Sequence, residues 1–110
     1  MYYINAGEFK HKITIQQYKE TINNDDIPVR SWENVLTTKA KVTNTRGDEY
    51  LQAQNIGVAI DKTFYIRYSK KVPITTDNQI VYNGQVYNIV YANNIMDLNK
   101  YIEIKAELKR

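Results

Sequence analysis

Alternating apolar and polar residues predict half-buried β-strands at two places in the second half of the chain. The most regular alternation covers residues 101–109, where the apolar face comprises Ile102, Ile104, Ala106 and Leu108. The other face carries Tyr, Glu and Lys side chains, so we expect it to be solvated. Residues 63–68 follow the same rule, with Phe64, Ile66 and Tyr68 predicted to point inward and Thr63, Tyr65 and Arg67 outward.

A tight hairpin is predicted where Asn83 and Gly84 separate two apolar segments, residues 80–82 and 85–89. A two-residue type I′ turn requires positive φ at both central positions, and Asn followed by Gly tolerates this best. Asn83 and Gly84 are therefore assigned as a structural turn. A further turn is predicted at residues 93–99, where Asn and Asp are frequent.

The N-terminal half contains a short strand pattern followed by a polar stretch. Ile13 and Ile15 share one face of residues 12–16, which predicts a strand there. Residues 18–30 contain consecutive Asn and Asp residues and a proline, a composition that favours a turn over a helix. We expect Trp32 to open a second β segment that pairs with the first as a hairpin with a long loop. Residues 35–45 are then predicted to form an edge or two-faced strand.

The strand pattern is interrupted between Gly47 and Gly57, where helical propensity exceeds strand propensity. A short helix or a long loop is therefore expected between the second and third main strands. Because it has little to bury, this segment is the best candidate for a flexible functional loop. Its candidate residues are Arg46, Gly47, Asp48, Glu49, Tyr50, Gln52, Gln54, Asn55, Ile56 and Gly57.

About six strands with closely spaced turn signals predict an all-β fold, namely a small antiparallel β-barrel or a sandwich. Closure into a barrel would also remove exposed sheet edges. With 110 residues, the chain is expected to form one domain over residues 1–110. Its content of 43% hydrophobic and 25% charged residues is typical of globular proteins and excludes a largely disordered chain.

The start of the chain lacks the basic region and apolar run of a signal peptide, so we expect a protein made and kept in a cytoplasm. No apolar stretch is long enough to predict a membrane-spanning helix, so no membrane partner is expected. The absence of cysteine excludes disulfide bonds and thiolate metal sites. Stability must therefore come from the core or from assembly with other subunits.

Few residues suggest catalysis or metal binding. The single histidine, His11, has no cysteine or second histidine beside it to complete a zinc site, and a strand-end hydrogen bond is its expected role. The acidic pairs Asp25 with Asp26 and Asp48 with Glu49 lack the Gly-spaced pattern of a calcium loop. No glycine motif for phosphate binding occurs. We therefore expect neither an enzyme nor a bound cofactor.

The net charge of +3 is a mild bias that an ordinary soluble surface explains. Lys70 and Lys71, together with Arg46, Lys62 and Arg67, could contact a phosphate backbone without sequence preference. The ten tyrosines suit half-buried strands and subunit interfaces, because each has an apolar ring and a polar tip.

In order and spacing, these segments resemble the head-tail joining proteins of long-tailed bacteriophages, also called head-closure or stopper proteins. The resemblance covers the chain from Gly7 onward and departs from the family in the first loop, where a glycine often precedes the Trp. The matching segments are residues 7–16, Trp32, residues 40–42, 47–49 with 53–54, 63–68, 80–89 and the last strand.

The resemblance implies a small β-barrel subunit that forms a ring, usually of twelve copies, in the neck of the virion. Such a ring lies beneath the portal and its adaptor, closes the DNA channel after packaging and offers a platform to the tail or its terminator. A loop between the second and third main strands can act as the plug, which here corresponds to residues 45–60. The implied partners are other copies of the chain, the adaptor and portal, the tail, and packaged DNA contacted non-specifically, with assembly in the host cytoplasm.

The main alternative is a small β-barrel that binds nucleic acid directly, of the OB or SH3-like kind. Such a module stacks bases on aromatic residues beside cations, as Tyr65 next to Arg67 would allow. The last strand argues against it, because Glu103 and Glu107 on its outer face would repel phosphate. Neck adaptors are mainly helical and tail terminators carry a long amphipathic helix, so neither matches this pattern.

Overall fold

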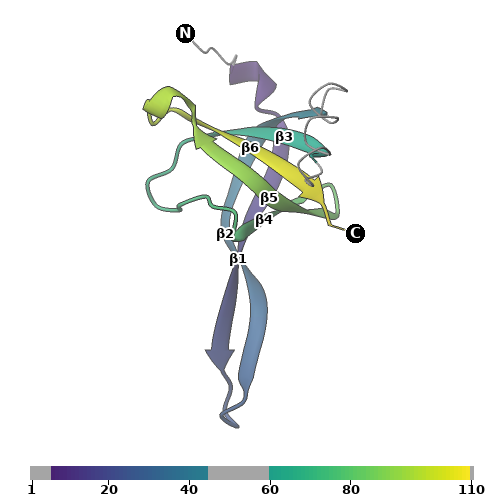
Figure 1. Cartoon of the computed structure of the whole chain (residues 1–110), viewed down its shortest axis with the longest axis vertical. Helices are drawn as coiled ribbons and strands as arrows, with labels where there is room; N and C mark the ends of the chain where they lie inside the picture. Colours follow the sequence, from purple (N-terminus) through teal and green to yellow (C-terminus); the bar gives the residue numbers. More distant parts are fainter. Residues whose placement is uncertain (1–5, 45–59, 110) are drawn as a thin grey trace.

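In the computed structural model, which describes residues 6–44 and 60–109, the strands form a closed antiparallel barrel in the order β1-β2-β3-β6-β5-β4 (Figure 1). The strands of the described residues are β1 (His11–Ile22), β2 (Pro28–Asn44), β3 (Lys62–Arg67), β4 (Asn78–Tyr82), β5 (Gln85–Asn94) and β6 (Tyr101–Leu108). Two short 3-10 helices, η1 (Ala6–Glu8) and η2 (Ile95–Asp97), precede β1 and β6. This architecture confirms the predicted all-β barrel. No helix in the described part of the chain is long and apolar enough to cross a membrane.

The hairpin between β4 and β5 has the predicted turn. Tyr82 pairs with Gln85, and the two residues between them have φ values of 52° for Asn83 and 77° for Gly84. Positive φ at both central positions is the signature of the type I′ turn. The predicted turn after β5 also forms, since η2 and the residues that follow it reverse the chain before β6.

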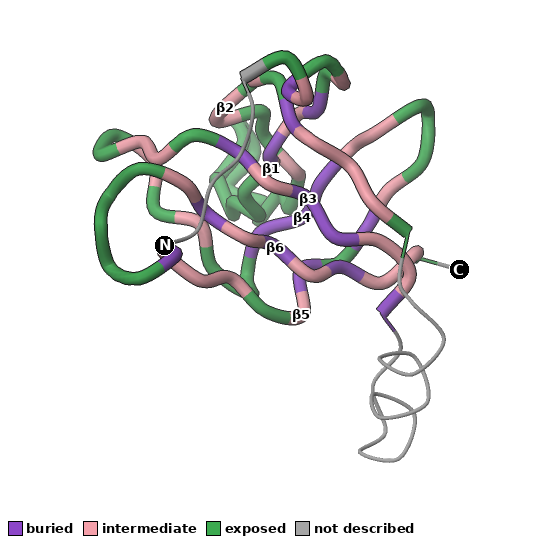
Figure 2. The backbone as a smooth tube through the Cα atoms, turned by 90° about the horizontal axis from the view of Figure 1, so that it is seen from above, coloured by how far each residue is buried: buried purple, intermediate pink, exposed green. Residues whose placement is uncertain are grey.

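The core of the barrel is built from alternate residues of all six described strands (Figure 2). Phe64 at its centre has no exposed surface, and its ring lies edge-on to those of Tyr82 and Tyr87. Along β6 the predicted alternation is confirmed: Ile102, Ile104 and Ala106 are buried, and Leu108 packs against the core from a partly buried position. The other described core members are Ile13, Ile15, Ala40, Ile66, Ile80, Tyr87 and Ile89.

The first hairpin differs most from the sequence prediction. β1 and β2 continue through most of the stretch expected to be a polar loop, and only residues 23–27 lie outside the two strands. The two strands run out of the barrel as a two-stranded ribbon, along the longest axis of a molecule that measures 53 × 32 × 26 Å (Figure 1). We call residues 18–32 the arm. Of the two alternatives for residues 35–45, an edge strand or a two-faced strand, the edge strand is wrong, because β2 pairs with β1 on one side and β3 on the other.

One residue predicted to point outward from β3 is buried. Thr63 lies on the outer face but is only 5% exposed. It pairs with Thr43 of β2 and Lys105 of β6, so it stands in the middle of three strands. Side chains on one face of neighbouring strands lie close together, and a short threonine between them loses its contact with water.

Candidate assembly surfaces

The candidate functional segment, residues 46–57, lies outside the described residues, but the described residues on either side of it lie close together. β2 ends at Asn44 and β3 begins at Lys62, and these two residues face each other as register partners. The Lys62 ammonium donates a hydrogen bond of 2.7 Å to Asn44 Oδ1. The described chain therefore stops and resumes on neighbouring strands, at paired positions.

The return of the chain into β3 is held by backbone and side-chain hydrogen bonds. The Asp61 N–H donates to the Ala106 carbonyl oxygen at 2.9 Å, and the Leu108 N–H donates to Asp61 Oδ2 at 2.7 Å. Ile60, just before it, is 9% exposed and belongs to the core. These contacts fix the position of residues 60–62, where the described chain resumes after the candidate segment. We call Asn44 and residues 60–62 the base of the segment.

The N-terminal residues cover the outer wall of the barrel over β2, β3 and β6. The Glu8 carboxylate pairs with the Lys41 ammonium at 2.7 Å, and that ammonium lies 5.5 Å from the centroid of the Tyr65 ring. The Tyr65 hydroxyl donates to Glu103 Oε2 at 3.1 Å. Acidic, basic and aromatic groups of η1, β2, β3 and β6 thus contact one another across the wall.

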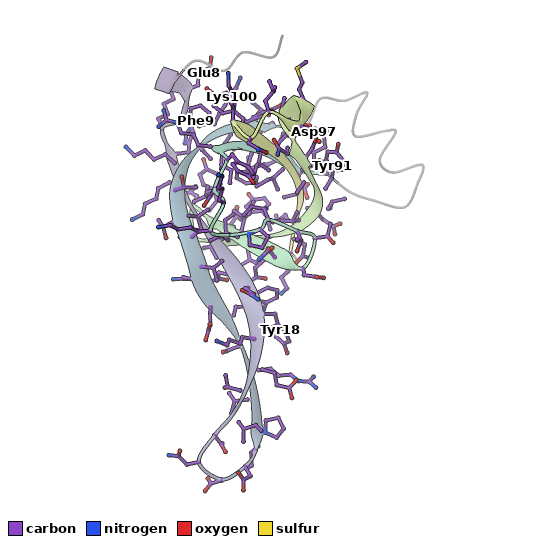
Figure 3. All side chains as sticks on the ribbon, turned by 90° about the vertical axis from the view of Figure 1, so that its left-hand side faces the viewer. Glu8, Phe9, Tyr18, Tyr91, Asp97 and Lys100 are labelled. Atoms are coloured by element: carbon purple, nitrogen blue, oxygen red, sulfur yellow. The ribbon has the colours of Figure 1, made fainter. Side chains whose placement is uncertain are left out.

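A second aromatic contact joins Phe9 to this wall (Figure 3). Its ring stacks on that of Tyr101 with centroids 5.6 Å apart, and the Arg67 guanidinium lies 5.5 Å from its centroid. The two residues proposed for base stacking, Tyr65 and Arg67, are therefore both engaged by other side chains. Because Lys41 lies over the Tyr65 ring and Arg67 over that of Phe9, this wall is a poor platform for stacked bases.

The arm is stabilised by cross-strand pairs. The rings of Tyr18 and Trp32, which are register partners, lie 5.1 Å apart between centroids, and the Lys109 ammonium lies 5.3 Å from the centroid of Trp32. Further along the arm, Lys19 pairs with Glu33 at 3.7 Å and Arg30 pairs with Glu20 at 3.6 Å. The matching order of charges on either side of the Asn-rich turn was the sequence signal that could have revealed the arm.

The base of the arm is fixed to the barrel through Gln16. Its side-chain amide donates to Asn34 Oδ1 at 2.8 Å, and its side-chain oxygen accepts from Gln79 Nε2 at 2.6 Å. Its backbone carbonyl accepts from Asn78 Nδ2 at 3.2 Å. Asn78 and Gln79 are 7% and 3% exposed, so these are hydrogen bonds between groups that would be costly to leave unpaired. The direction of the arm is therefore set by the barrel.

The turn at the end of the arm is an Asx turn. Asn23 Oδ1 accepts hydrogen bonds from the N–H groups of Asp25 at 2.9 Å and Ile27 at 3.0 Å. Asp26 adopts a positive φ of 59°, which Asp tolerates better than most residues. The turn is thus closed by its own side chain and does not depend on contact with the barrel.

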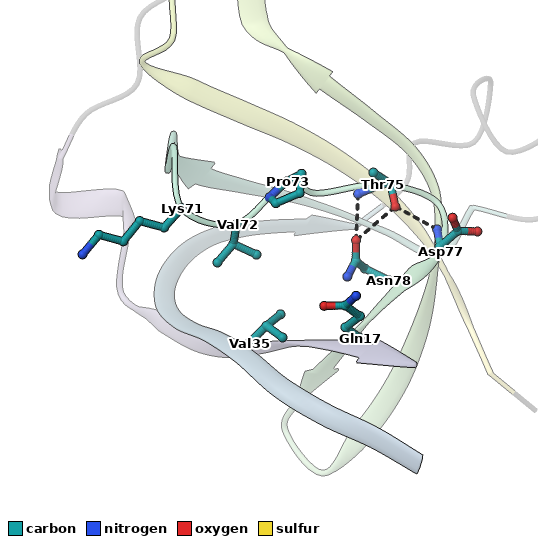
Figure 4. A pocket seen from close by; sticks show the side chains of 8 residues that line it. All are labelled: Gln17, Val35, Lys71, Val72, Pro73, Thr75, Asp77 and Asn78. Atoms are coloured by element: carbon teal, nitrogen blue, oxygen red, sulfur yellow. Dashed lines mark hydrogen bonds between the residues drawn. The ribbon is translucent and has the colours of Figure 1, made fainter. Parts of the chain in front are cut away.

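Loop 69–77 lies in the connection between β3 and β4, and two of the pockets that it borders have apolar walls formed by Val72 and Pro73. The first, of about 420 Å³, lies between this loop and the base of the arm, where Gln17 and Val35 face Val72 and Asp77 (Figure 4). Asn78 closes this end of the loop, because the N–H and hydroxyl of Thr75 both donate to Asn78 Oδ1. The second pocket, of about 430 Å³, lies between the loop and the strands β5 and β6.

Within the described ranges, 6–44 and 60–109, no group of three or more acidic, histidine or cysteine residues could hold a metal ion. His11 makes the hydrogen bond expected at the start of its strand, with 3.3 Å between its Nδ1 and the Tyr82 hydroxyl. Burial, and to a lesser extent the charge of Asp61, raises the pKa of Tyr87 above its ordinary value.

These features define a small closed β-barrel that carries a long arm and a segment of chain anchored at one edge. The family model for phage head completion proteins matches residues 4–109. The chain belongs to this family, and its role is structural, in the head-tail region of a phage particle.

Two solved structures are similar in fold. The solution structure of protein SF1141 from Shigella flexneri 2a is 23% identical, with a TM-score of 0.72 over 96% of each chain. A chain from the virion of a native gene transfer agent particle is 12% identical, with a TM-score of 0.61 over 91% of this chain and 94% of that chain. The curated proteins contain no match to this chain.

Proposed function

We propose that the chain forms a dodecameric ring in the neck, beneath the portal and adaptor, that closes the DNA channel after packaging and provides the surface on which the tail docks. Membership of the head completion family supports the location. The fixed base at Asn44 and Lys62 supports the closing role, because a rigid frame lets a long connection project into a channel without disturbing the barrel. In this proposal the residues 46–57 contact packaged DNA without sequence preference, and assembly takes place in the host cytoplasm.

The channel-closing role is tested by deleting residues 52–56, five residues of the candidate segment. We expect the variant to keep its thermal unfolding midpoint, because the anchoring contacts at Asp61 and Lys62 lie outside the deletion. Particles that carry it should lose their genome, measured as the fraction of nuclease-protected DNA and of full heads in electron micrographs. A control that replaces residues 52–56 with Gly and Ser of equal length separates the role of the sequence from that of the length.

Stable, full heads with the deletion would refute the closing role. The ring itself is tested by a cryo-EM map of the virion neck, where we expect this chain between adaptor and tail. Its absence from the particle would refute the whole proposal. Direct nucleic-acid binding is tested separately with the free protein, and retention of DNA with a steep salt dependence at physiological salt would favour that function instead.

A further inference from the structure

We propose that the arm tip of one subunit, residues 22–29, binds the pocket beside Lys70 on the next copy of the chain. The inference rests on the proposed ring and names the contact that joins its subunits. The occupant of this pocket is a second copy of the chain.

The arm tip is both apolar and acidic. Ile22, Ile27 and Val29 are 71%, 55% and 41% exposed, an unusual concentration of apolar side chains at the end of a protruding ribbon. Neither Asp25 nor Asp26 takes part in an ion pair within the described residues. The tip therefore presents branched apolar groups beside two unpaired carboxylates.

The remainder of the arm is less suited to pairing with another chain. Its charges, from Lys19, Glu20, Arg30 and Glu33, already form pairs across the two strands. Charged residues along an exposed strand also discourage the addition of a further strand. The tip is therefore the part of the arm that is best suited to contact another subunit.

The pocket of about 430 Å³ has the complementary chemistry. Its apolar lining includes Val72, Pro73 and Ile74 of the loop and Ala92 and Ile102 of the barrel wall, and the exposed Lys70 stands at its border. No carboxylate is among the described residues that line it, and Lys70 takes part in no ion pair with a described residue.

The neighbouring pocket is a poorer receptor for the same tip. Asp77 lines it and would repel the acidic turn, which offsets the attraction of Lys71 at the same pocket. Gln17 and Val35 of the same subunit's β1–β2 hairpin already form one of its sides (Figure 4). The two pockets lie on either side of Val72 and Pro73, which line both of them. The neighbouring pocket can therefore serve as the control site in a cross-linking experiment.

The occupant is a second copy because a subunit's own tip points away from its own pocket. The arm extends from one end of the barrel, whereas loop 69–77 lies beside the barrel wall, at the left of the view in Figure 1. The anchored Gln16 holds the arm in this direction. A contact between unlike surfaces of identical subunits repeats head to tail and closes into a ring when the rotation permits.

The experiment uses the lack of cysteine in the chain, so that every disulfide formed is between introduced residues. Phage particles are assembled with the double variant Ile27→Cys with Ser69→Cys, oxidised mildly and separated on a non-reducing gel. We expect a ladder of covalent oligomers of this chain. The control carries Ile27→Cys with Gln17→Cys, which places the second thiol at the other pocket and keeps Asp77 there, and its yield of oligomers should be at least about tenfold lower.

Each other outcome contradicts the inference. Particles that contain the protein but give no ladder would show a ring held by different contacts, leaving the proposed function intact. A cross-linked monomer would show a tip folded onto its own subunit, and dimers of the single variant Ile27→Cys would show contact between tips. Absence of the unsubstituted protein from particles would overturn both the inference and the proposed function.

Charge reversal tests the electrostatic part of the contact in the same cross-linking assay. Asp25→Lys or Lys70→Glu alone should lower the cross-linking yield by about threefold, as expected for an exposed ion pair. The two reversals together should restore it, which general damage to the fold would not allow. Failure of the double reversal to recover the yield would remove this pair from the contact.

Discussion

Removal of the arm should leave the barrel folded. Gln17 and Glu33 face each other as register partners at the base of the arm, so residues 18–32 can be replaced by an Asn-Gly turn between them. The chain itself uses this turn between Tyr82 and Gln85. None of the deleted residues contributes to the core of the described barrel, and the anchoring residue Gln16 is kept.

The expected loss of stability follows from the contacts that the deletion removes. The pair of Tyr18 and Trp32 is worth about 0.5 to 1.5 kcal/mol, and the ammonium of Lys109 over Trp32 adds about 0.5 to 1 kcal/mol. The two ion pairs of the arm are solvent-exposed and contribute little. Since the deletion also removes the entropy cost of ordering the ribbon, we expect the free energy of unfolding to fall by at most about 2 kcal/mol.

Urea unfolding followed by circular dichroism measures this change, because the deletion removes the single tryptophan and its fluorescence. The comparison is Phe64→Ala, which truncates a fully buried ring and should cost about 3 to 5 kcal/mol. If the arm deletion costs as much as this substitution, or abolishes cooperative unfolding, the arm is part of the folding unit and the reasoning is wrong. According to the proposed tip contact, the folded variant should also fail to form the ring.

Three further changes test individual parts of the structure. Gly84→Ala should lower the free energy of unfolding, measured with urea, by about 1 to 2 kcal/mol, because its φ of +77° strains any residue that has a Cβ. An added Cβ would meet no atom within 4 Å, so the loss would come from the backbone alone, and unchanged stability would refute this explanation. Gln16→Ala should cost about 1 to 3 kcal/mol by leaving the buried Gln79 amide without its acceptor, and hydrogen exchange in the arm should rise. Because the pKa of Tyr87 is raised in the folded protein, its hydroxyl loses its proton at lower pH in the unfolded chain, and the free energy of unfolding should fall as the pH rises above about 10. Tyr87→Phe should reduce that fall, measured by urea unfolding at alkaline pH.

The parts of the fold that the sequence predicts are those in which one face of a strand is buried. Ile102, Ile104 and Ala106 alternate with polar residues because every second position of β6 faces the core. The turn at Asn83 and Gly84 is predictable for a different reason, since it depends only on the local conformational freedom of two residues.

The arm was not predicted because neither of its faces is buried. Beyond Gln16, all residues of β1 are exposed, so burial imposes no alternation of apolar and polar residues there. The consecutive Asn and Asp residues were correctly assigned to a turn, but the turn is short and the flanking residues are strands. The burial of the Asn78 and Gln79 amides could not be predicted from the sequence either, because their partner Gln16 is more than half the chain away in sequence.

The seam that closes the barrel also governs how the chain folds. Residues 14–17 of β1 pair with residues 78–81 of β4, whereas β1–β2 and β4–β5 are hairpins of neighbouring strands. Closing the seam requires most of the chain to form one large loop, so it is expected to be the slow step. Until it closes, both seam strands expose edges that can pair with another chain. Substitutions that weaken the seam, such as at Ile80, should therefore reduce the yield of soluble subunits during infection before they affect any finished particle.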